Sequence, residues 1–113
     1  MPKKKLWVDD IRNPPADLDC DIARNYAEAV ALLEANTYYA LYIDHDLGDF
    51  DAAGKEKTGY DVLMYLALMK MAGSAVPQHY ELLTANPVGA ERMEGVIYRY
   101  LMGGEFGPND SIT

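Results

Sequence analysis

Short apolar runs alternate along the chain with longer stretches whose apolar residues recur at helical spacing. The short runs predict β-strands, because each is nearly continuous and bounded by polar residues or turn formers. They span residues 5–8, 20–25, 39–44 and 80–85. The longer stretches predict α-helices. They span residues 26–36, 59–71 and 89–102. Mostly apolar strands that alternate with helices are typical of a parallel sheet flanked by helices, so the predicted fold class is α/β.

The helix predicted over residues 59–71 carries apolar side chains on nearly every side. Thr58 is a suitable N-cap, and Asp61 three residues later predicts a weak capping box. A helix with so much apolar surface is either deeply buried or covered by a partner. Residues 60–71 are therefore a candidate surface for a homodimer or for another protein. The polar segment 48–58 before the helix contains glycine and is expected to be a loop.

Composition is that of a globular protein. The chain has 113 residues, half of them hydrophobic and a quarter charged, which predicts a single domain over residues 1–113. The net charge of −8 argues against an extended nucleic-acid surface and against binding to an anionic membrane. The longest apolar stretch, residues 62–69, is too short to cross a bilayer, and the N-terminal apolar run is too short for a signal peptide. The single cysteine, Cys20, excludes an internal disulfide and is expected to be a small buried residue, and the chain is expected to be cytoplasmic.

Carboxylates follow two of the predicted strands at the point where each strand ends. Asp9 and Asp10 follow the first strand, and Asp44 and Asp46 lie at the end of the strand over residues 39–44. Because ligands bind at the carboxyl ends of the strands in an open α/β sheet, these side chains are expected to converge. Like charges so close repel each other unless a cation lies among them. Oxygen ligands without cysteine favour Mg²⁺ or Mn²⁺, with Ca²⁺ as a further option, so all four residues are predicted metal ligands.

His45 lies between two of these predicted ligands. Side chains alternate along a strand, so Asp44 and Asp46 are expected to face the metal while His45 faces the other way. Two roles are open for His45: a catalytic acid or base in contact with phosphate, or a structural residue hydrogen-bonded beneath the site. Asp44 has a second candidate catalytic role, as an attacking nucleophile. His79, at the start of the last predicted strand and away from this edge, is expected to be structural.

The segment TANPVG after the last predicted strand is suited to binding a phosphate. The Thr84 hydroxyl and the Asn86 amide can donate hydrogen bonds, and N–H groups near Gly89 at a helix start would attract an anion. Arg12, just beyond the first acidic pair, could reach a phosphate with two N–H groups. The alternatives are an ordinary capped strand-to-helix connection and a surface arginine.

These motifs together resemble the receiver domains of two-component response regulators. LWVDD, the aspartate that ends the third strand, GYDVL and LLTA follow the receiver order. The resemblance implies that Asp9 and Asp10 hold Mg²⁺, that Asp44 accepts a phosphoryl group and that Thr84 contacts it. A receiver also uses a lysine at the end of a fifth strand, and this chain has no lysine after Lys70. Phosphorelay signalling is therefore the weaker interpretation.

A narrower resemblance, to the cyclic-phosphate processing receiver-like domains, covers residues 5–101. Four ordered motifs carry it: LWVDDIRNPP, IDHDLGD, TGYDVL and TANPVGAERM. It implies a receiver-like (flavodoxin-like) fold whose last strand–helix unit is truncated or degenerate, because too few residues follow Leu101 to form one. It also implies action on phosphoesters such as cyclic phosphates. Members often carry a histidine where this chain has Leu83. If that histidine is a general acid, this chain either uses His45 instead or is a weaker catalyst.

Three functions are compatible with these patterns. The preferred one is a divalent-metal-dependent phosphoesterase that acts on a cyclic phosphate, a small nucleotide or an RNA end, with metal-bound water as the attacking group. The second is a binding module for a nucleotide or a protein, without chemistry, which Leu83 and the apolar helix favour. A phospho-accepting response regulator is the third. The partner expected for the preferred function is a small phosphorylated ligand.

Overall fold

The computed structural model describes residues 4–102, which contain a four-stranded parallel sheet. The strands are β1 (Lys5–Val8), β2 (Asp21–Ala23), β3 (Ala40–Ile43) and β6 (His79–Leu82), in the order β2-β1-β3-β6. The helices are α1 (Tyr26–Ala35), α2 (Gly59–Met71) and α3 (Pro87–Val96), and a π-helical turn, η1 (Ile97–Leu101), follows α3. This arrangement confirms the predicted receiver-like α/β class. In the described part of the chain the sheet ends at β6, without a fifth strand.

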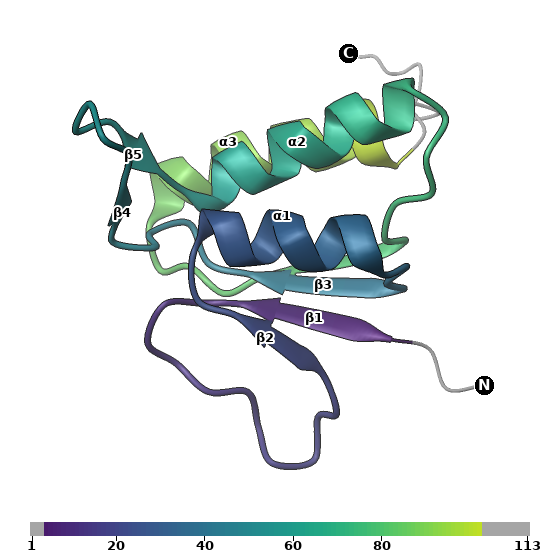
Figure 1. Cartoon of the computed structure of the whole chain (residues 1–113), viewed down its shortest axis with the longest axis horizontal. Coiled ribbons are helices and arrows are strands. Elements are labelled where there is room, and N and C mark those ends of the chain that lie inside the picture. Colours follow the sequence, from purple (N-terminus) through teal and green to yellow (C-terminus); the bar gives the residue numbers. More distant parts are fainter. Residues whose placement is uncertain (1–3, 103–113) are drawn as a thin grey trace.

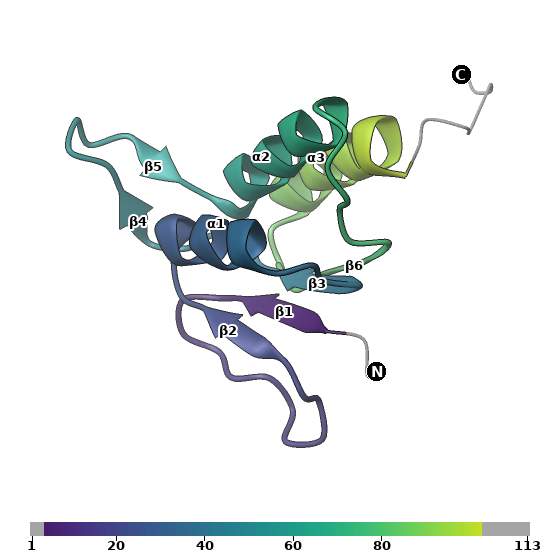
Figure 2. The same cartoon turned by 45° about the vertical axis from the view of Figure 1, so that its right-hand side comes forward.

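All three α-helices lie on the same face of the sheet (Figures 1 and 2). Successive side chains of a strand point to opposite faces, so each strand contributes every second residue to the core under the helices. Leu6 and Val8 of β1, and Leu41 and Ile43 of β3, are fully buried in that core. The helices contribute Ala29, Leu33, Val62, Leu63, Leu66, Met93 and Val96. This packing holds the ends of β1 and β3 side by side, with Val8 in register with Ile43.

The opposite face of the sheet carries no helix in the described residues and is partly covered by the connection between β1 and β2 (Figure 1). Parallel sheets usually have helices on both faces, so this one-sided cover is unusual. Trp7 and Tyr42 point to this face and stack with ring centroids 5.9 Å apart. The buried Trp7 donates its Nε1–H to the Arg12 carbonyl at 3.1 Å, which ties the connection to the sheet. Cys20, expected to be buried, is half-buried.

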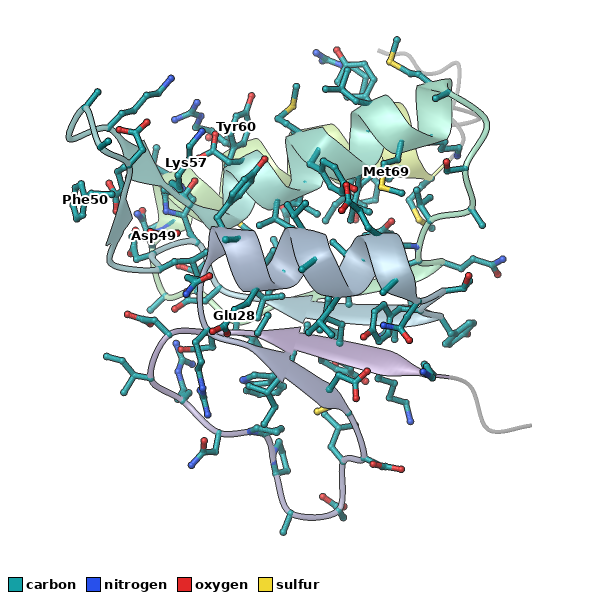
Figure 3. All side chains as sticks on the ribbon, in the orientation of Figure 1. Glu28, Asp49, Phe50, Lys57, Tyr60 and Met69 are labelled. Carbon is teal, nitrogen blue, oxygen red and sulfur yellow. The ribbon has the colours of Figure 1, made fainter. Side chains whose placement is uncertain are left out.

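The segment before α2 contains a small antiparallel hairpin. Its strands are β4 (Asp49–Phe50) and β5 (Glu56–Lys57). The loop prediction for residues 48–58 was wrong here, because strands of two residues are too short to show an alternating pattern. The hairpin is fixed to the start of α1, where the Tyr26 N–H donates to Asp49 Oδ2 at 3.1 Å. Figure 3 shows Asp49 beside the N-terminal end of α1.

β6 is an edge strand, whereas the pattern over residues 80–85 predicted a buried one. It pairs with β3 alone among the described strands. Tyr80 and Leu82 are half-buried against the core, while His79 and Glu81 are exposed on the other face. The prediction failed because burial of a strand depends on a neighbour that periodicity does not report. His79 begins the strand, at the end opposite to the carboxyl edge.

The helix boundaries agree closely with the predicted ones. The Thr58 N–H donates to the Asp61 carboxylate at 2.8 Å, which confirms the capping box before α2. α2 is buried on one side, but Leu68 is 64% exposed and Met71 is 75% exposed. A partner on the surface formed by residues 60–71 stays a prediction. No helix between residues 4 and 102 has both the length and the apolar character of a membrane span.

Candidate functional site

The ends of β1 and β3 bring three carboxylates together. Asp9, Asp10 and Asp44 each offer an oxygen, and these oxygens all lie within 4.8 Å of one another. Asp9 is 1% exposed and Asp44 is 7% exposed, whereas Asp10 is partly open to solvent. The predicted convergence of strand-end carboxylates is thus present for these three residues. Such a group has the oxygen chemistry that divalent cations prefer.

The two oxygens of Asp9 have different environments. Oδ1 accepts the N–H groups of Ile11 and Arg12, both at 3.0 Å, which fixes the turn after β1. Oδ2 is buried and makes no hydrogen bond with the described residues. A buried carboxylate oxygen without a hydrogen bond is costly unless a cation compensates it. In the protein this cation is the Arg12 guanidinium, whose Nε lies 3.2 Å from Oδ2, and a divalent cation could take its place.

Asp44 is a buried carboxyl whose charged form is disfavoured. Its Oδ1 accepts the N–H of the next residue, His45, at 2.8 Å. Burial raises the pKa of the Asp44 carboxyl, and the neighbouring Asp9 and Asp46 carboxylates act in the same direction. The His45 N–H and the Arg12 guanidinium oppose this rise. A cation at Asp44 Oδ2 would favour the charged form.

Arg12 supplies the positive charge that the acidic group faces within the protein. Its Nε lies 3.2 Å from Asp9 Oδ2 as an ion pair, and its Nη2 lies 3.5 Å from Asp44 Oδ2. Its Nη1 donates to the Leu83 carbonyl at 3.1 Å, so one guanidinium joins the ends of β1, β3 and β6. The side chain is nevertheless 57% exposed. The sequence predicted that Arg12 is either a phosphate contact or a surface residue. Neither prediction included its contacts with Asp9, Asp44 and the Leu83 carbonyl.

Asp46 lies outside the group of three carboxylates. Its side chain is 61% exposed, and its Oδ1 lies 2.8 Å from His45 Nδ1. The argument from side-chain alternation does not reach Asp46, because β3 already ends at Ile43 and the chain then turns. Asp46 therefore contacts the His45 ring in this structure, whereas the sequence predicted that it lies with the metal ligands.

Two glycines allow helices to approach the residues after β3 closely. A Cβ at Gly59 would lie 2.0 Å from the Asp44 backbone oxygen, and the Gly59 N–H donates to the His45 carbonyl at 2.8 Å. A Cβ at Gly89 would lie 2.7 Å from His45 Cγ. α2 and α3 thus both begin against the Asp44–His45 segment, and the His45 side chain is only 14% exposed between them. The glycines in the motifs TGYDVL and TANPVG are required by this packing.

The predicted phosphate segment forms a capped helix start. The Asn86 N–H donates to Thr84 Oγ1 at 3.0 Å, and the Gly89 N–H donates to Asn86 Oδ1 at 3.2 Å. The predicted role of Gly89 as a donor to phosphate does not agree with this geometry, because its N–H already has a partner and the residue is buried. The Thr84 hydroxyl proton and the Asn86 side-chain amide group remain as donors.

A comparison with protein families matches residues 4–99 to the family described as the cyclic-phosphate processing receiver domain. The chain belongs to this family. Comparisons with curated proteins and with solved structures gave no match. The assignment confirms the resemblance carried by the four motifs, and it ties this receiver domain to cyclic-phosphate processing.

The geometry explains why those motifs have their spacing in this receiver domain. The acidic pair and Arg12 lie in LWVDDIRNPP, and Asp44 lies in IDHDLGD, so the first two motifs meet at the acidic group. TGYDVL and TANPVG contribute Gly59 and Gly89, which hold the helices against the second motif. Sequence reasoning missed these two contacts. A glycine at the start of an otherwise well-formed helix was the available signal, because glycine weakens helices unless a close approach requires it.

Proposed function

We propose that this receiver domain is a divalent-metal-dependent phosphoesterase that acts on a cyclic phosphate, a small nucleotide or an RNA end. The observation that carries the proposal is the group formed by Asp9, Asp10 and Asp44, in which the buried Asp9 Oδ2 makes no hydrogen bond and is paired with the exposed guanidinium of Arg12. Carboxylates without cysteine favour Mg²⁺ or Mn²⁺. Membership of a family tied to cyclic-phosphate processing supports a phosphoester as the substrate.

In this proposal the three carboxylates hold the cation, and Arg12 binds the substrate phosphate. Bound Mg²⁺ or Mn²⁺ would polarise a phosphoryl oxygen and lower the pKa of a water molecule. Arg12 contacts the carboxylates with a side chain that is 57% exposed, so it can turn outward once a cation replaces it. The planar guanidinium of Arg12 can then donate hydrogen bonds to two phosphate oxygens. The Thr84 hydroxyl, whose oxygen accepts the Asn86 N–H, donates a hydrogen bond to the same phosphate.

His45 is assigned the proton transfer, with Asp46 as the residue that positions it. The contact between His45 Nδ1 and Asp46 Oδ1 at 2.8 Å leaves Nε2 to exchange a proton with the attacking or leaving oxygen. A carboxylate on one ring nitrogen fixes the orientation of the ring and the tautomer. The packing of the ring against Gly89 places it beside the phosphate segment. Asp44 is assigned to the cation in preference to nucleophilic attack, because it is part of the carboxylate group.

The second candidate is a binding module that performs no chemistry. The contacts of Arg12 with Asp9 and Asp44 favour it, because a tethered guanidinium can neutralise the acidic group without a metal. Leu83 also favours it, because leucine has no proton to transfer, whereas a histidine at that position could act as an acid. In this alternative Arg12 is a permanent structural counter-ion, and the phosphate segment alone binds the ligand.

Hydrolysis of a nucleoside 2′,3′-cyclic phosphate, followed with Mn²⁺ and with EDTA, separates the two candidates. The phosphoesterase predicts turnover that EDTA abolishes and that Asp10→Asn lowers. Asp10 is chosen because its side chain forms no hydrogen bond with another described residue, so its replacement should leave the fold intact. Binding of the cyclic phosphate without turnover, equal in Mn²⁺ and in EDTA, would assign the chain to the binding class.

A further inference from the structure

We propose that the outer edge of β6 pairs with the same edge of a second copy of this chain, antiparallel and across a two-fold axis. Among the described strands, β6 is paired on one side only, by β3. An unpaired strand edge presents N–H and C=O groups that pair readily with another strand. The edge of β6 therefore offers backbone hydrogen bonds to a partner.

The hydrogen bonds between β6 and β3 show which backbone groups point outward. The His79 N–H donates to the Tyr39 carbonyl at 3.1 Å. The Leu83 N–H donates to the Ile43 carbonyl at 2.9 Å. Backbone groups alternate in direction along a strand, so the N–H and C=O of Tyr80 point away from β3. Two copies can therefore exchange a pair of Tyr80 N–H···O=C bonds across the two-fold axis.

The side chains of His79 and Glu81 select this register. When Tyr80 lies opposite the second copy's Tyr80, His79 of each copy lies directly opposite Glu81 of the other. Both side chains are on the helix-free face, and they are 49% and 55% exposed. A pairing centred on Glu81 would instead place two carboxylates opposite each other, which is unfavourable. The edge is thus complementary to itself, as a two-fold contact requires, and this makes a second copy the best occupant.

The helix layer leaves room beside this edge. A hollow of about 210 Å³ lies between the start of β6 and the end of the helix layer, and Tyr98 and Met102 form part of its wall. Tyr98 is 57% exposed and Met102 is 44% exposed. A second copy that pairs with β6 could cover part of the exposed Tyr98 and Met102 side chains, so apolar burial would add to the backbone hydrogen bonds.

Sedimentation equilibrium of the full chain, combined with a charge exchange at the edge, tests the proposal. The wild type should form dimers. Glu81→Lys should weaken dimerisation roughly tenfold, because both symmetry-related pairs lose the contact between an imidazole and a carboxylate. His79→Glu should do the same, and the double variant should restore the wild-type dissociation constant. Asp17→Lys makes the same charge change on the connection between β1 and β2 and should leave dimerisation unchanged.

The His79 and Glu81 variants also distinguish a contact between two copies from the contact within one chain, where His79 Nε2 lies 3.9 Å from Glu81 Oε2. A role within one chain would change the free energy of unfolding of the monomer but not the oligomeric state. A monomeric wild type, or a dimer that Glu81→Lys does not weaken, would overturn the proposal. Dimers that form only after removal of residues 103–113 would assign the edge to the chain's own C-terminal segment and would overturn it too.

Discussion

Arg12 Nη2 lies 3.5 Å from Asp44 Oδ2, although 32 positions separate the two residues along the chain. The same guanidinium faces Asp9 Oδ2, the buried oxygen without a hydrogen bond. Arg12 therefore stands at the oxygens that a divalent cation would use. A cation that enters the acidic group must displace the guanidinium or share the carboxylates with it.

Replacing Arg12 should strengthen metal binding and weaken phosphate binding. Arg12→Gln removes a positive charge that competes for Asp9 and Asp44, so the affinity for Mn²⁺ should rise by roughly tenfold. The affinity for a cyclic phosphate should fall, because the variant loses a guanidinium that can donate two hydrogen bonds to the phosphate. Calorimetric titration of each ligand measures both effects. Arg99→Gln makes the same charge change on η1 and is the matched control. Mn²⁺ affinity that falls in Arg12→Gln would show that Arg12 supports the site and does not compete in it.

Asp44 should destabilise the metal-free protein at neutral pH. Burial raises its pKa above the value in the unfolded chain, so the native state binds more protons and stability falls as the pH rises above about 4. Asp44→Asn removes this penalty. In EDTA the variant should unfold at higher urea concentration than the wild type at pH 7, and the difference should shrink as the pH falls towards about 4. A wild type that is the more stable protein at pH 7 would contradict the assignment.

Gly59 should be intolerant of any side chain. Gly59→Ala places a Cβ 2.0 Å from the Asp44 backbone oxygen, and backbone atoms cannot move aside as a flexible side chain can. The free energy of unfolding should fall by about 3 kcal/mol. Gly95→Ala is the control on α3, where a Cβ meets no atom within 4 Å. It should raise the stability by about 0.5–1 kcal/mol through helix propensity. Equal effects of the two substitutions in urea unfolding would refute the close approach of α2.

His45 should act on turnover more than on binding. If it transfers a proton, His45→Ala should lower the turnover of a cyclic phosphate by roughly a hundredfold or more, while the affinity changes little. His79→Ala removes the other histidine at the start of β6 and should leave turnover unchanged. Circular dichroism would check that the His45 variant is folded, because its ring packs against Gly89. Undiminished turnover in folded His45→Ala would make the residue structural.

Much of the fold could be predicted from periodicity and from the chemistry of strand ends. Continuous apolar runs predicted β1 and β3, and an N-cap with its reciprocal carboxylate predicted the start of α2. The general rule that ligands bind at the carboxyl ends of parallel strands was sufficient to bring Asp9, Asp10 and Asp44 together. These features depend on local pattern, or on topology that follows directly from it.

Other features depend on contacts between distant segments, and the sequence did not predict them. Strand alternation placed Asp46 with Asp44, but β3 ends one residue before Asp44, so the rule no longer applied. The burial of β6 was overestimated because an apolar run does not show whether a neighbouring strand exists. The direction of the Arg12 side chain is decided by carboxylates and a carbonyl from three strand ends, which only the folded chain brings together.

The central claim is that Asp9, Asp10 and Asp44 hold a divalent cation, and calorimetric titration with Mn²⁺ tests it most directly. The wild type should bind one Mn²⁺ per chain. Asp10→Asn should lose most of that affinity, whereas Asp46→Asn, the same change at the neighbouring carboxylate outside the group, should retain it. A wild type that binds no Mn²⁺, or an Asp46→Asn variant that loses as much affinity as Asp10→Asn, would contradict the account.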